Sequence, residues 1–487
     1  MASVLSCPVF GQTPANISAE VKRGGELASV VCANCHLFPE PGLLDKQTWK
    51  NGALPNMDKL LGLSKMKNDP NPDAQRVFAD WLLIRKFYVE RAPEIAPPQK
   101  EHPKIAIGLK QFDVITPDYR SPPPYITLTK IDPITRQIYV GNARTKSLDV
   151  LDPMAKLLTS IPVDSPPVSL TIKSNGLFVT LIGSVPPSDD PQGKLVWIQR
   201  NGDKYTNGAE LVHHILRPTD AQFADLNNDG RQDFVLSGFG NVTGRFSWYE
   251  NLGHDQYREH VLFDRPGAIR SCVYDFNHDG HLDLIVMMAQ AKEGIYIFAN
   301  RGRGEFTEVP VIEYHPLWGS SYFELVDFNK DGFIDILATN GDNGEYPSCM
   351  KNYHGVRLYL NDGKNRFREA FFYPLNGAFK AIAADFDRDG DLDIAAISYF
   401  PDYENSPEES FVYLENLGDL EFKAATFKDC FAGRWLTMDV GDLDGDGDLD
   451  LVLGACNRSP YKVSRAIASL WETNGPTLLL LKNTVKK

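Results

Sequence analysis

The sequence lacks the features that would place the protein on a nucleic acid or through a membrane. It has fewer basic than acidic residues, 50 Lys and Arg against 64 Asp and Glu, and its formal net charge is −14. Binding to a phosphate backbone rests on clustered Lys and Arg, so this balance excludes a nucleic-acid partner. No uninterrupted apolar run reaches the about 18 residues that a membrane-spanning helix needs, so no transmembrane helix is expected.

Motifs of several enzyme and metal classes are missing as well. The chain has no Gly-rich dinucleotide-binding fingerprint and none of the repeated Trp motifs of quinoprotein propellers. The closely spaced thiols of Cys32 and Cys35 have no second ligand pair nearby, which zinc would need. Their helical surroundings also lack the βαβ context of a thioredoxin-type site. A zinc site and a dithiol redox site are therefore the weaker interpretations of this pair.

The first residues, 1–19, form an irregular tail that contains one of the seven cysteines. This tail lacks the positive start and the full apolar stretch of a signal peptide, but Val4-Leu5-Ser6-Cys7 resembles the end of a bacterial lipoprotein signal. Either Cys7 is a lipidated N-terminus or it is an unmodified cysteine in the tail. We expect an exported protein of the periplasm or cell surface, with Cys7 as the candidate lipid anchor.

The rest of the chain divides into a helical part and a β part. Residues 20–92 show helical patterning, for example apolar residues at Val77, Trp81, Ile84 and Tyr88 on one helical face. Residues 93–104 are too rich in proline for regular structure and form a linker. Short β-runs with alternating patterning fill residues 105–487.

The helical part carries the C-x-x-C-H signature of covalent haem attachment in Val31-Cys32-Ala33-Asn34-Cys35-His36. Thiols one helical turn apart can add to the two vinyl groups of a haem, and His36 then places an imidazole under the iron. Met57, just after Pro55, is the expected second axial ligand, with Met66 as the alternative. Methionine and histidine together favour electron transfer, whereas a missing sixth ligand would free the iron for small molecules.

The β part contains five copies of a D-x-[DN]-x-D-G-x-x-D loop, whose first residues are 50 to 58 apart. Each copy is followed by a strand such as FVLSG or LIVMM and by a second strand that ends in Asn-Leu-Gly or a similar turn. This unit predicts a four-stranded blade. Two degenerate copies, around Thr171 and Thr129, bring the prediction to a mainly β, seven-bladed propeller that follows a small all-α domain. The segments IAIGLKQFDVI and TLLLLKN are expected to close the ring.

The same loops predict about five calcium ions, because Ca²⁺ takes six to eight oxygen ligands. Loop positions one, three and five supply side-chain oxygens, position seven a carbonyl oxygen, and position nine closes the site. These ions are expected to stabilise the turns and to have no catalytic duty. The predicted metal residues are Asp225, Asn227, Asp229, Arg231, Asp233, Asp275, Asn277, Asp279, His281, Asp283, Asp327, Asn329, Asp331, Phe333, Asp335, Asp385, Asp387, Asp389, Asp391, Asp393, Asp442, Asp444, Asp446, Asp448 and Asp450.

Two family resemblances follow from these motifs. Residues from about 165 to 455 resemble the FG-GAP/VCBS repeats, the calcium-binding propeller blades that integrin α-chains also use. Residues 20–92 resemble class I cytochromes c in the helix around Gly25, the C-x-x-C-H motif and the closing aromatic helix. The segment from His36 to Leu44 is also similar to the cytochrome segment that precedes FG-GAP repeats in some bacterial exported proteins. That resemblance implies an architecture and no particular reaction.

The longer insertions and several charged or aromatic residues are expected on the propeller face opposite the calcium loops. The inter-blade residues assigned to this face are Arg270, Trp318, Lys380, Arg434 and Trp435, and it is a candidate site for a small molecule or a glycan. Cys349, Cys430 and Cys456 fall toward the same face, with Cys430 and Cys456 as a candidate disulfide, and Cys272 is expected in the core.

Three functions are compatible with the sequence. The first is an extracytoplasmic electron-transfer protein whose propeller docks a redox partner, a membrane-associated complex or a substrate. The second is an oxidoreductase, such as a haem-linked dehydrogenase, with its active site on the propeller face. The third is a binding or adhesion subunit of a larger complex in which the haem is secondary.

Overall fold

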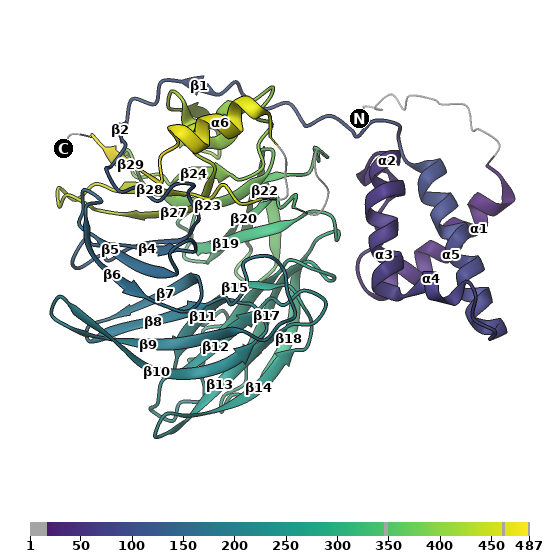
Figure 1. Ribbon diagram of the computed structural model, residues 1–487, viewed down its shortest axis with the longest axis horizontal. Helices are drawn as coiled ribbons and strands as arrows, with labels where there is room; N and C mark the ends of the chain where they lie inside the picture. Colours follow the sequence, from purple (N-terminus) through teal and green to yellow (C-terminus); the bar gives the residue numbers. More distant parts are fainter. Residues whose placement is uncertain (1–16, 345–348, 460–462, 486–487) are drawn as a thin grey trace, which may run out of the picture. The chain divides into compact units, whose positions relative to one another are not determined.

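The computed structural model describes residues 17–344, 349–459 and 463–485, and it divides the chain into two compact units after Pro97. The first unit is helical and the second is a β-propeller (Figure 1). The division falls within the Pro-rich segment 93–104. Within the described residues, no helix combines the length and the apolar character that crossing a membrane requires.

The helical unit is built from two long helices with short helical turns between them. Its elements are α1 (Ala19–Val31), η1 (Cys32–Asn34), η2 (Pro41–Leu43), α2 (Lys46–Thr48), the π-helical turn η3 (Trp49–Ala53), α3 (Leu54–Leu61), α4 (Leu63–Met66) and α5 (Pro72–Arg91). The side chain of Ser18 caps the start of α1, and Asn71 followed by Pro72 starts α5. Trp81, Ile84 and Tyr88 of α5 are buried.

Helices α1 and α5 pack closely because two glycines stand where they cross. A Cβ atom at Gly24 would lie 2.2 Å from the carbonyl oxygen of Leu83, and one at Gly25 would lie 2.9 Å from the ring of Phe87. Contacts this short exclude any larger side chain without movement of a helix backbone. The Trp49 ring covers Tyr88 on α5, with ring centroids 4.3 Å apart. This contact packs the turn η3 against α5.

The second unit is a seven-bladed propeller, as the sequence predicts. The first six blades each hold four consecutive strands, and the seventh combines the last three strands with an early one. Blade 1 contains β3 (Ile126–Ile131), β4 (Ile138–Asn142), β5 (Ser147–Leu151) and β6 (Leu157–Pro162); blade 2 contains β7 (Pro167–Lys173), β8 (Gly176–Leu181), β9 (Gly193–Asn201) and β10 (Lys204–Ile215); blade 3 contains β11 (Pro218–Ala224), β12 (Asp233–Gly238), β13 (Arg245–Gly253) and β14 (Gln256–Phe263); blade 4 contains β15 (Ala268–Tyr274), β16 (Asp283–Met288), β17 (Gly294–Asn300) and β18 (Phe306–Glu313).

The remaining blades follow the same order. Blade 5 contains β19 (Ser320–Val326), β20 (Asp335–Asn340), β21 (Gly355–Asn361) and β22 (Phe367–Pro374); blade 6 contains β23 (Ala378–Ala384), β24 (Asp393–Ser398), β25 (Phe411–Asn416) and β26 (Phe422–Thr426); blade 7 contains β27 (Trp435–Gly441), β28 (Asp450–Ala455) and β29 (Leu478–Asn483). Three short helical elements, η4 (Pro407–Ser410), η5 (Cys430–Ala432) and α6 (Arg465–Thr473), lie in the connections of blades 6 and 7.

The ring closes where the sequence predicts it. Strand β2 (Phe112–Ile115) pairs antiparallel with β29 and becomes the outer strand of blade 7. Phe112 is buried against Phe386 and Tyr413 of blade 6, so this strand also fills the gap between two blades. A second early strand, β1 (Ala106–Ile107), pairs parallel with β26 of blade 6, which the sequence pattern does not predict.

The second strand of each of blades 3 to 7 is buried along its whole length. Both faces of such a strand are covered by neighbouring blades, which explains the continuous apolar runs FVLSG, LIVMM, ILATN, IAAIS and LVLGA. The first strand of every blade shows one register shift at the same place, near its start. The repeat therefore fixes the positions of loops and side chains around the whole ring.

Candidate functional site

All five Asp-rich loops connect the first strand of a blade to its second strand. Loop 225–233 belongs to blade 3, 275–283 to blade 4, 327–335 to blade 5, 385–393 to blade 6 and 442–450 to blade 7. The corresponding turns of blades 1 and 2 lack the repeated carboxylates. Since the five loops occupy one position in the blade, they lie on one face of the ring.

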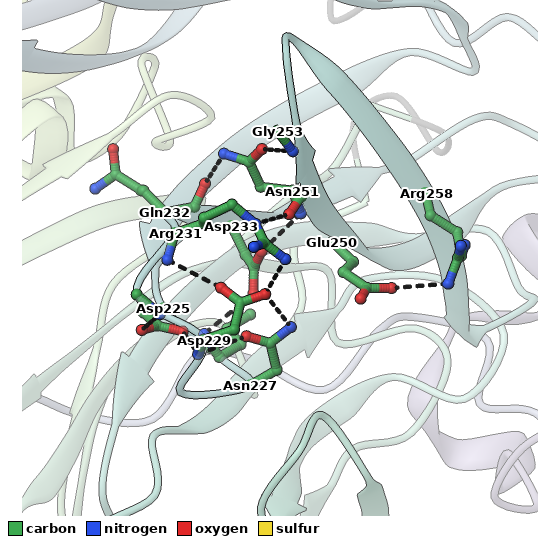
Figure 2. Close-up of polar contacts among 12 residues, drawn as sticks. Asp225, Asn227, Asp229, Arg231, Gln232, Asp233, Glu250, Asn251, Gly253 and Arg258 are labelled. Atoms are coloured by element: carbon green, nitrogen blue, oxygen red, sulfur yellow. Dashed lines mark hydrogen bonds and ion pairs between the residues drawn. The ribbon is translucent and has the colours of Figure 1, made fainter.

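The first loop shows how the backbone gathers its oxygen atoms (Figure 2). The N–H group of Asp229 donates to Asp225 Oδ1 and to Asn227 Oδ1, each at 3.1 Å. The N–H group of Gly230, whose φ is 83°, donates to Asp225 Oδ2 at 2.8 Å. Loops 275–283 and 327–335 repeat these bonds. The carboxylates of positions one and five and the amide of position three thus converge on one small turn.

The aspartate at position nine is buried in every loop and fastens the loop to the blade. Its Oδ1 accepts an N–H bond from the end of the third strand at 2.7 to 2.8 Å, and its Oδ2 accepts the N–H bond of loop position two at 2.8 to 3.2 Å. These residues are Asp233, Asp283, Asp335, Asp393 and Asp450. Each carboxylate therefore joins three parts of its blade.

The partner of this aspartate is not predicted from the sequence. It is an asparagine at the end of the third strand, the first residue of the repeated Asn-Leu-Gly or similar turn. In addition to its backbone bond, the side-chain amide of this asparagine donates to the carbonyl oxygen of loop position eight at 3.0 to 3.2 Å. The five residues are Asn251, Asn300, Asn361, Asn416 and Asn483. The in-phase repetition of this residue in the sequence was the available signal.

Negative charge accumulates most in the loops of blades 6 and 7. Carboxylate oxygens of Asp385, Asp387 and Asp389 lie within 4.8 Å of one another, as do those of Asp442, Asp444 and Asp450. Burial raises the pKa of Asp393 and of Asp450 to about 6. Burial, reinforced by neighbouring Asp446, also raises the pKa of Asp448 to about 6. These loops hold more negative charge than their protein surroundings neutralise.

Side chains at position seven do not share one role. Arg231 pairs with Asp229, and its Nε donates to the carbonyl oxygen of Asn251 at 2.5 Å (Figure 2). Asp391 lies 3.9 Å from Lys330 of the neighbouring blade and is exposed. The side chain at position seven therefore has no single role in the five loops, and the ligand role of its backbone carbonyl group stays a prediction.

The C-x-x-C-H motif lies at the carboxyl end of α1. Cys32 caps this helix, and the N–H group of Cys35 donates to the Cys32 carbonyl oxygen at 3.3 Å in the turn η1. Both thiols are free, with Cys35 exposed and Cys32 partly buried. Burial raises the pKa of the Cys32 thiol, which accepts a contact from the Tyr88 hydroxyl at 3.8 Å. His36 Nδ1 lies 2.9 Å from the carbonyl oxygen of Leu37.

Both candidate methionine ligands lie in helices. Met57 is in the first half of α3, and Met66 is the last residue of α4; both side chains are partly buried. Met57 lies in the same helix as Pro55 and not in a loop. Pro55 occupies the first turn of α3, where its missing N–H group costs no hydrogen bond, so the helix continues through Met57.

The residues assigned to the opposite face are not all loop residues. Arg270 and Lys380 lie within the first strands β15 and β23, and Trp435 starts β27 with its ring fully buried. Trp318 lies in a turn and covers the guanidinium group of Arg357 at 4.2 Å. Arg434 is buried beside the Tyr399 ring at 4.3 Å. The assignment of Arg270, Lys380 and Trp435 to inter-blade loops is therefore wrong, because all three lie in first strands. Tyr346 of the neighbouring insertion is outside the described residues.

The cysteines outside the C-x-x-C-H motif form no disulfide within the described residues. Cys430 and Cys456 are both free and buried, so the expected bond between them is wrong. The Cys430 thiol contacts the carbonyl oxygens of Pro407 and Glu408, whereas Cys456 contacts the Tyr399 hydroxyl and the carbonyl oxygen of Arg458. Cys272 is only partly buried, and Cys7 is outside the described residues.

A cavity of about 490 Å³ lies between blades 2 and 3. Its walls include His213 and His214 of β10 and Arg245, Tyr249 and Glu259 of blade 3. This cavity is lined by β10 of blade 2 and by β12, β13 and β14 of blade 3, and it does not include the residues that the sequence assigns to the face opposite the Asp-rich loops.

One comparison with known proteins supports the prediction of FG-GAP-like repeats. A family model described as an FG-GAP-like repeat matches residues 225–286, 275–338 and 346–396. The crystal structure of Saccharomyces cerevisiae Sqt1 is similar over 76% of this chain and 98% of that chain, at 8% identity and a TM-score of 0.46. No curated protein matches the sequence.

The fold and the loops together define a seven-bladed β-propeller that carries FG-GAP-like repeats. A propeller of this kind suggests a binding or docking role, because its rigid ring presents loops on two faces. The particular partner and the chemistry of the helical unit are matters of proposal.

Proposed function

We propose that this protein is an extracytoplasmic electron-transfer protein. One haem c is attached covalently to the helical unit, and a calcium-stabilised propeller docks a redox partner, a membrane-associated complex or a substrate. The observation that carries the proposal is the C-x-x-C-H motif at the end of α1, with two free thiols one turn apart on a helix that packs against an aromatic closing helix.

The residues around the motif fit a covalently held haem. Val30, Val31 and Leu37 flank the thiols and are 65%, 44% and 37% exposed, so an apolar macrocycle held there would cover them. The close crossing of α1 and α5 at Gly24 keeps the end of α1, and with it both thiols, in a fixed position. When bound, the haem supplies one-electron transfer.

His36 is suited to the proximal position. A proton on Nδ1, donated to the carbonyl oxygen of Leu37, leaves the lone pair of the ring on Nε2. That tautomer is the one an iron ligand needs. Met57 is the proposed second ligand and Met66 the alternative, because both lie in the helical segment between the motif and α5.

The Asp-rich loops fit calcium. Each offers carboxylate or amide oxygens from positions one, three, five and nine, and the site is completed by a carbonyl oxygen at position seven. Burial first, and neighbouring carboxylates second, raise the pKa of Asp393 and of Asp450, and a divalent cation bound there would oppose both effects. The ions would fix the first-to-second-strand turn of five blades and stiffen the docking scaffold.

The experiment is production of the full chain in a host that exports proteins and matures c-type cytochromes. A pyridine haemochrome spectrum tests for covalent haem, and a redox titration tests whether it cycles. Cys35→Ser is expected to remove one thioether bond and to shift the haemochrome band. Cys430→Ser is the matched control, because a hydroxyl group can keep the contacts of that thiol with two carbonyl oxygens. Protein without Soret absorption contradicts the proposal.

Donor tests separate electron transfer from the other functions. A haem that is reduced only by protein or dye donors supports the carrier function. Reduction of the haem by added alcohols or sugars, in the presence of calcium, would instead assign an oxidoreductase with its active site on the propeller. If the protein binds a partner stably, and reduction of the haem does not change this binding, the function is that of a binding or adhesion subunit.

A further inference from the structure

The first strands of the seven blades place one side chain each at an equivalent position around the axis of the ring. These strands contact one another in sequence around the propeller, and their shared register shift aligns them. The residues just after the shift are Leu128, Ser169, Asp220, Arg270, Tyr322, Lys380 and Thr437. Two residues further along come Lys130, Thr171, Gln222, Cys272, Glu324, Ile382 and Asp439. The inner wall of the propeller thus carries three cations and three carboxylates.

The three carboxylates are used to join blades. Asp220 accepts the backbone N–H bond of Ser271 at 3.0 Å. Glu324 accepts that of Ala383 at 2.6 Å. Asp439 accepts that of Ile131 at 2.8 Å and lies 3.3 Å from Lys130. Each bond joins one blade to the next, so these carboxylates stabilise the ring. One of the three cations, Lys130, is already paired with a carboxylate.

The other two cations lie together and are not neutralised in this way. The guanidinium carbon of Arg270 lies 4.3 Å from the centre of the Tyr322 ring, and Lys380 Nζ lies 4.7 Å from the same ring. Arg270 donates its Nε–H to the carbonyl oxygen of Phe323 at 2.8 Å. Within the described part of the chain, neither cation forms an ion pair, and Lys380 donates no hydrogen bond. All three side chains keep some exposure to solvent.

Although burial opposes it, nearby groups, Tyr322 first among them, raise the pKa of Arg270, so this cation stays charged. Burial lowers the pKa of Lys380 to about 8, and Arg270 and Lys130 add to this effect, although Asp439 opposes it. Burial also raises the pKa of Glu324 to about 7, so this carboxyl is only partly ionised at neutral pH. An anion bound between the cations would hold Lys380 protonated.

We propose that Arg270, Tyr322 and Lys380, from three consecutive blades, form a binding site for a small oxyanion on the inner wall of the propeller. The guanidinium group supplies directed donors for two oxygens, and the ammonium group supplies a charge and up to three further donors. The ligand is small because the inner walls of seven blades surround it. Carboxylates and tetrahedral oxyanions, such as a phosphate or sulfate group, share this chemistry. The site does not depend on the haem.

The test is titration of the calcium-loaded full chain at pH 7 with sodium sulfate and, separately, with sodium acetate. Isothermal calorimetry measures the affinity, and sodium chloride at equal ionic strength controls for screening. We expect one saturable site per chain. Lys380→Met should weaken binding at least about tenfold, since it removes a desolvated charge from the site. Lys364→Met, on an exposed hairpin turn, is the matched control and should change nothing.

The same variants distinguish loss of the anion site from loss of folding stability. Lys380 has no ion pair or hydrogen bond to lose within the described residues, so Lys380→Met should fold and should melt no lower than the wild type without anion. Tyr322→Phe keeps the ring and provides a second variant. Binding of sulfate alone would assign a tetrahedral oxyanion, and binding of acetate alone would assign a carboxylate. The proposal is overturned if sodium chloride produces the same binding heat as the oxyanions. It is also overturned if the wild type and Lys380→Met bind the anion with equal affinity.

Discussion

Removing calcium should weaken the propeller more at neutral pH than at mildly acidic pH. In the loops of blades 6 and 7, Asp393, Asp448 and Asp450 have pKa values raised from the usual 3.8 to about 6 when no metal is present. A carboxyl group with a raised pKa binds a proton more tightly in the folded state than in the unfolded state. The metal-free fold therefore loses stability as the pH rises from about 4 through 6 and regains it on acidification.

The size of the effect follows from these values. When the pH falls from 7.5 to 5.0, a carboxyl group with a folded pKa of about 6 stabilises the metal-free fold by roughly 1.4 kcal/mol. The reason is that a proton bound only in the folded state adds about 1.36 kcal/mol of stability per pH unit below that pKa. Three such groups give about 4 kcal/mol if they act independently. In a domain of this size the melting temperature then moves by roughly 5 °C. Calcium holds the same carboxylates ionised, so the loaded protein lacks this gain.

Differential scanning calorimetry can measure the increase in melting temperature that calcium produces at each pH. Taking the difference between loaded and metal-free protein cancels groups away from the loops, such as the buried His354, whose pKa lies well below its usual range. We expect the calcium-dependent increase to be smaller at pH 5.0 by roughly 5 °C. Asp393→Asn should reduce this difference, whereas Asp391→Asn, at an exposed position, should leave it unchanged.

Two results would refute this reasoning. One is a calcium-dependent increase that is equal at both pH values or greater at pH 5.0. The other is loss of the Soret band together with calcium, since the helical unit and the propeller are separate compact units and the haem should survive chelation.

Three further predictions concern the helical unit. Met57→Ala should lower the midpoint potential of the haem by removing a thioether ligand, while Met66→Ala should leave it unchanged; a redox titration in which only Met66→Ala responds would exchange their roles. Gly24→Ala should destabilise the helical unit by about 1–3 kcal/mol, because its Cβ atom would lie 2.2 Å from a backbone oxygen. Gly42→Ala has open space around it and should not destabilise the unit. Equal melting temperatures of the two variants would contradict the close helix crossing. Cys32→Ser should leave a haem held by one thioether bond, so the haem mass should stay with the protein after acid acetone extraction while the haemochrome band shifts. Loss of all haem, or an unshifted band, would contradict single attachment.

Much of the propeller could be predicted because each blade repeats the same local signals. The Asp-rich turn, the apolar second strand and the closing asparagine recur in phase, and the spacing alone locates the two degenerate blades. Closure by residues 112–115 could be predicted because the last blade is otherwise one strand short. Such features depend on residues that are near one another in the sequence or that repeat.

Other features depend on long-range packing and could not be predicted. Trp435 looks like a loop residue, but it begins an inner strand and is buried, with its Nε1 donating to the carbonyl oxygen of Cys430. The pairing of Cys430 with Cys456 fails because each thiol contacts different carbonyl groups. Arg270 and Lys380 meet at one tyrosine only because a register shift aligns three strands that lie more than 50 residues apart in the chain.

The closure strand sets the order in which the protein can mature. Strand β2 finds its partner only after β29, about 360 residues later, has left the ribosome or the export channel, which at ordinary synthesis speeds takes roughly 20–70 s. Until then the ring stays open, because β2 has no partner strand in blade 7. The helices need nothing from that distant strand, so a maturation enzyme could reach Cys32 and Cys35 while the β part is still incomplete.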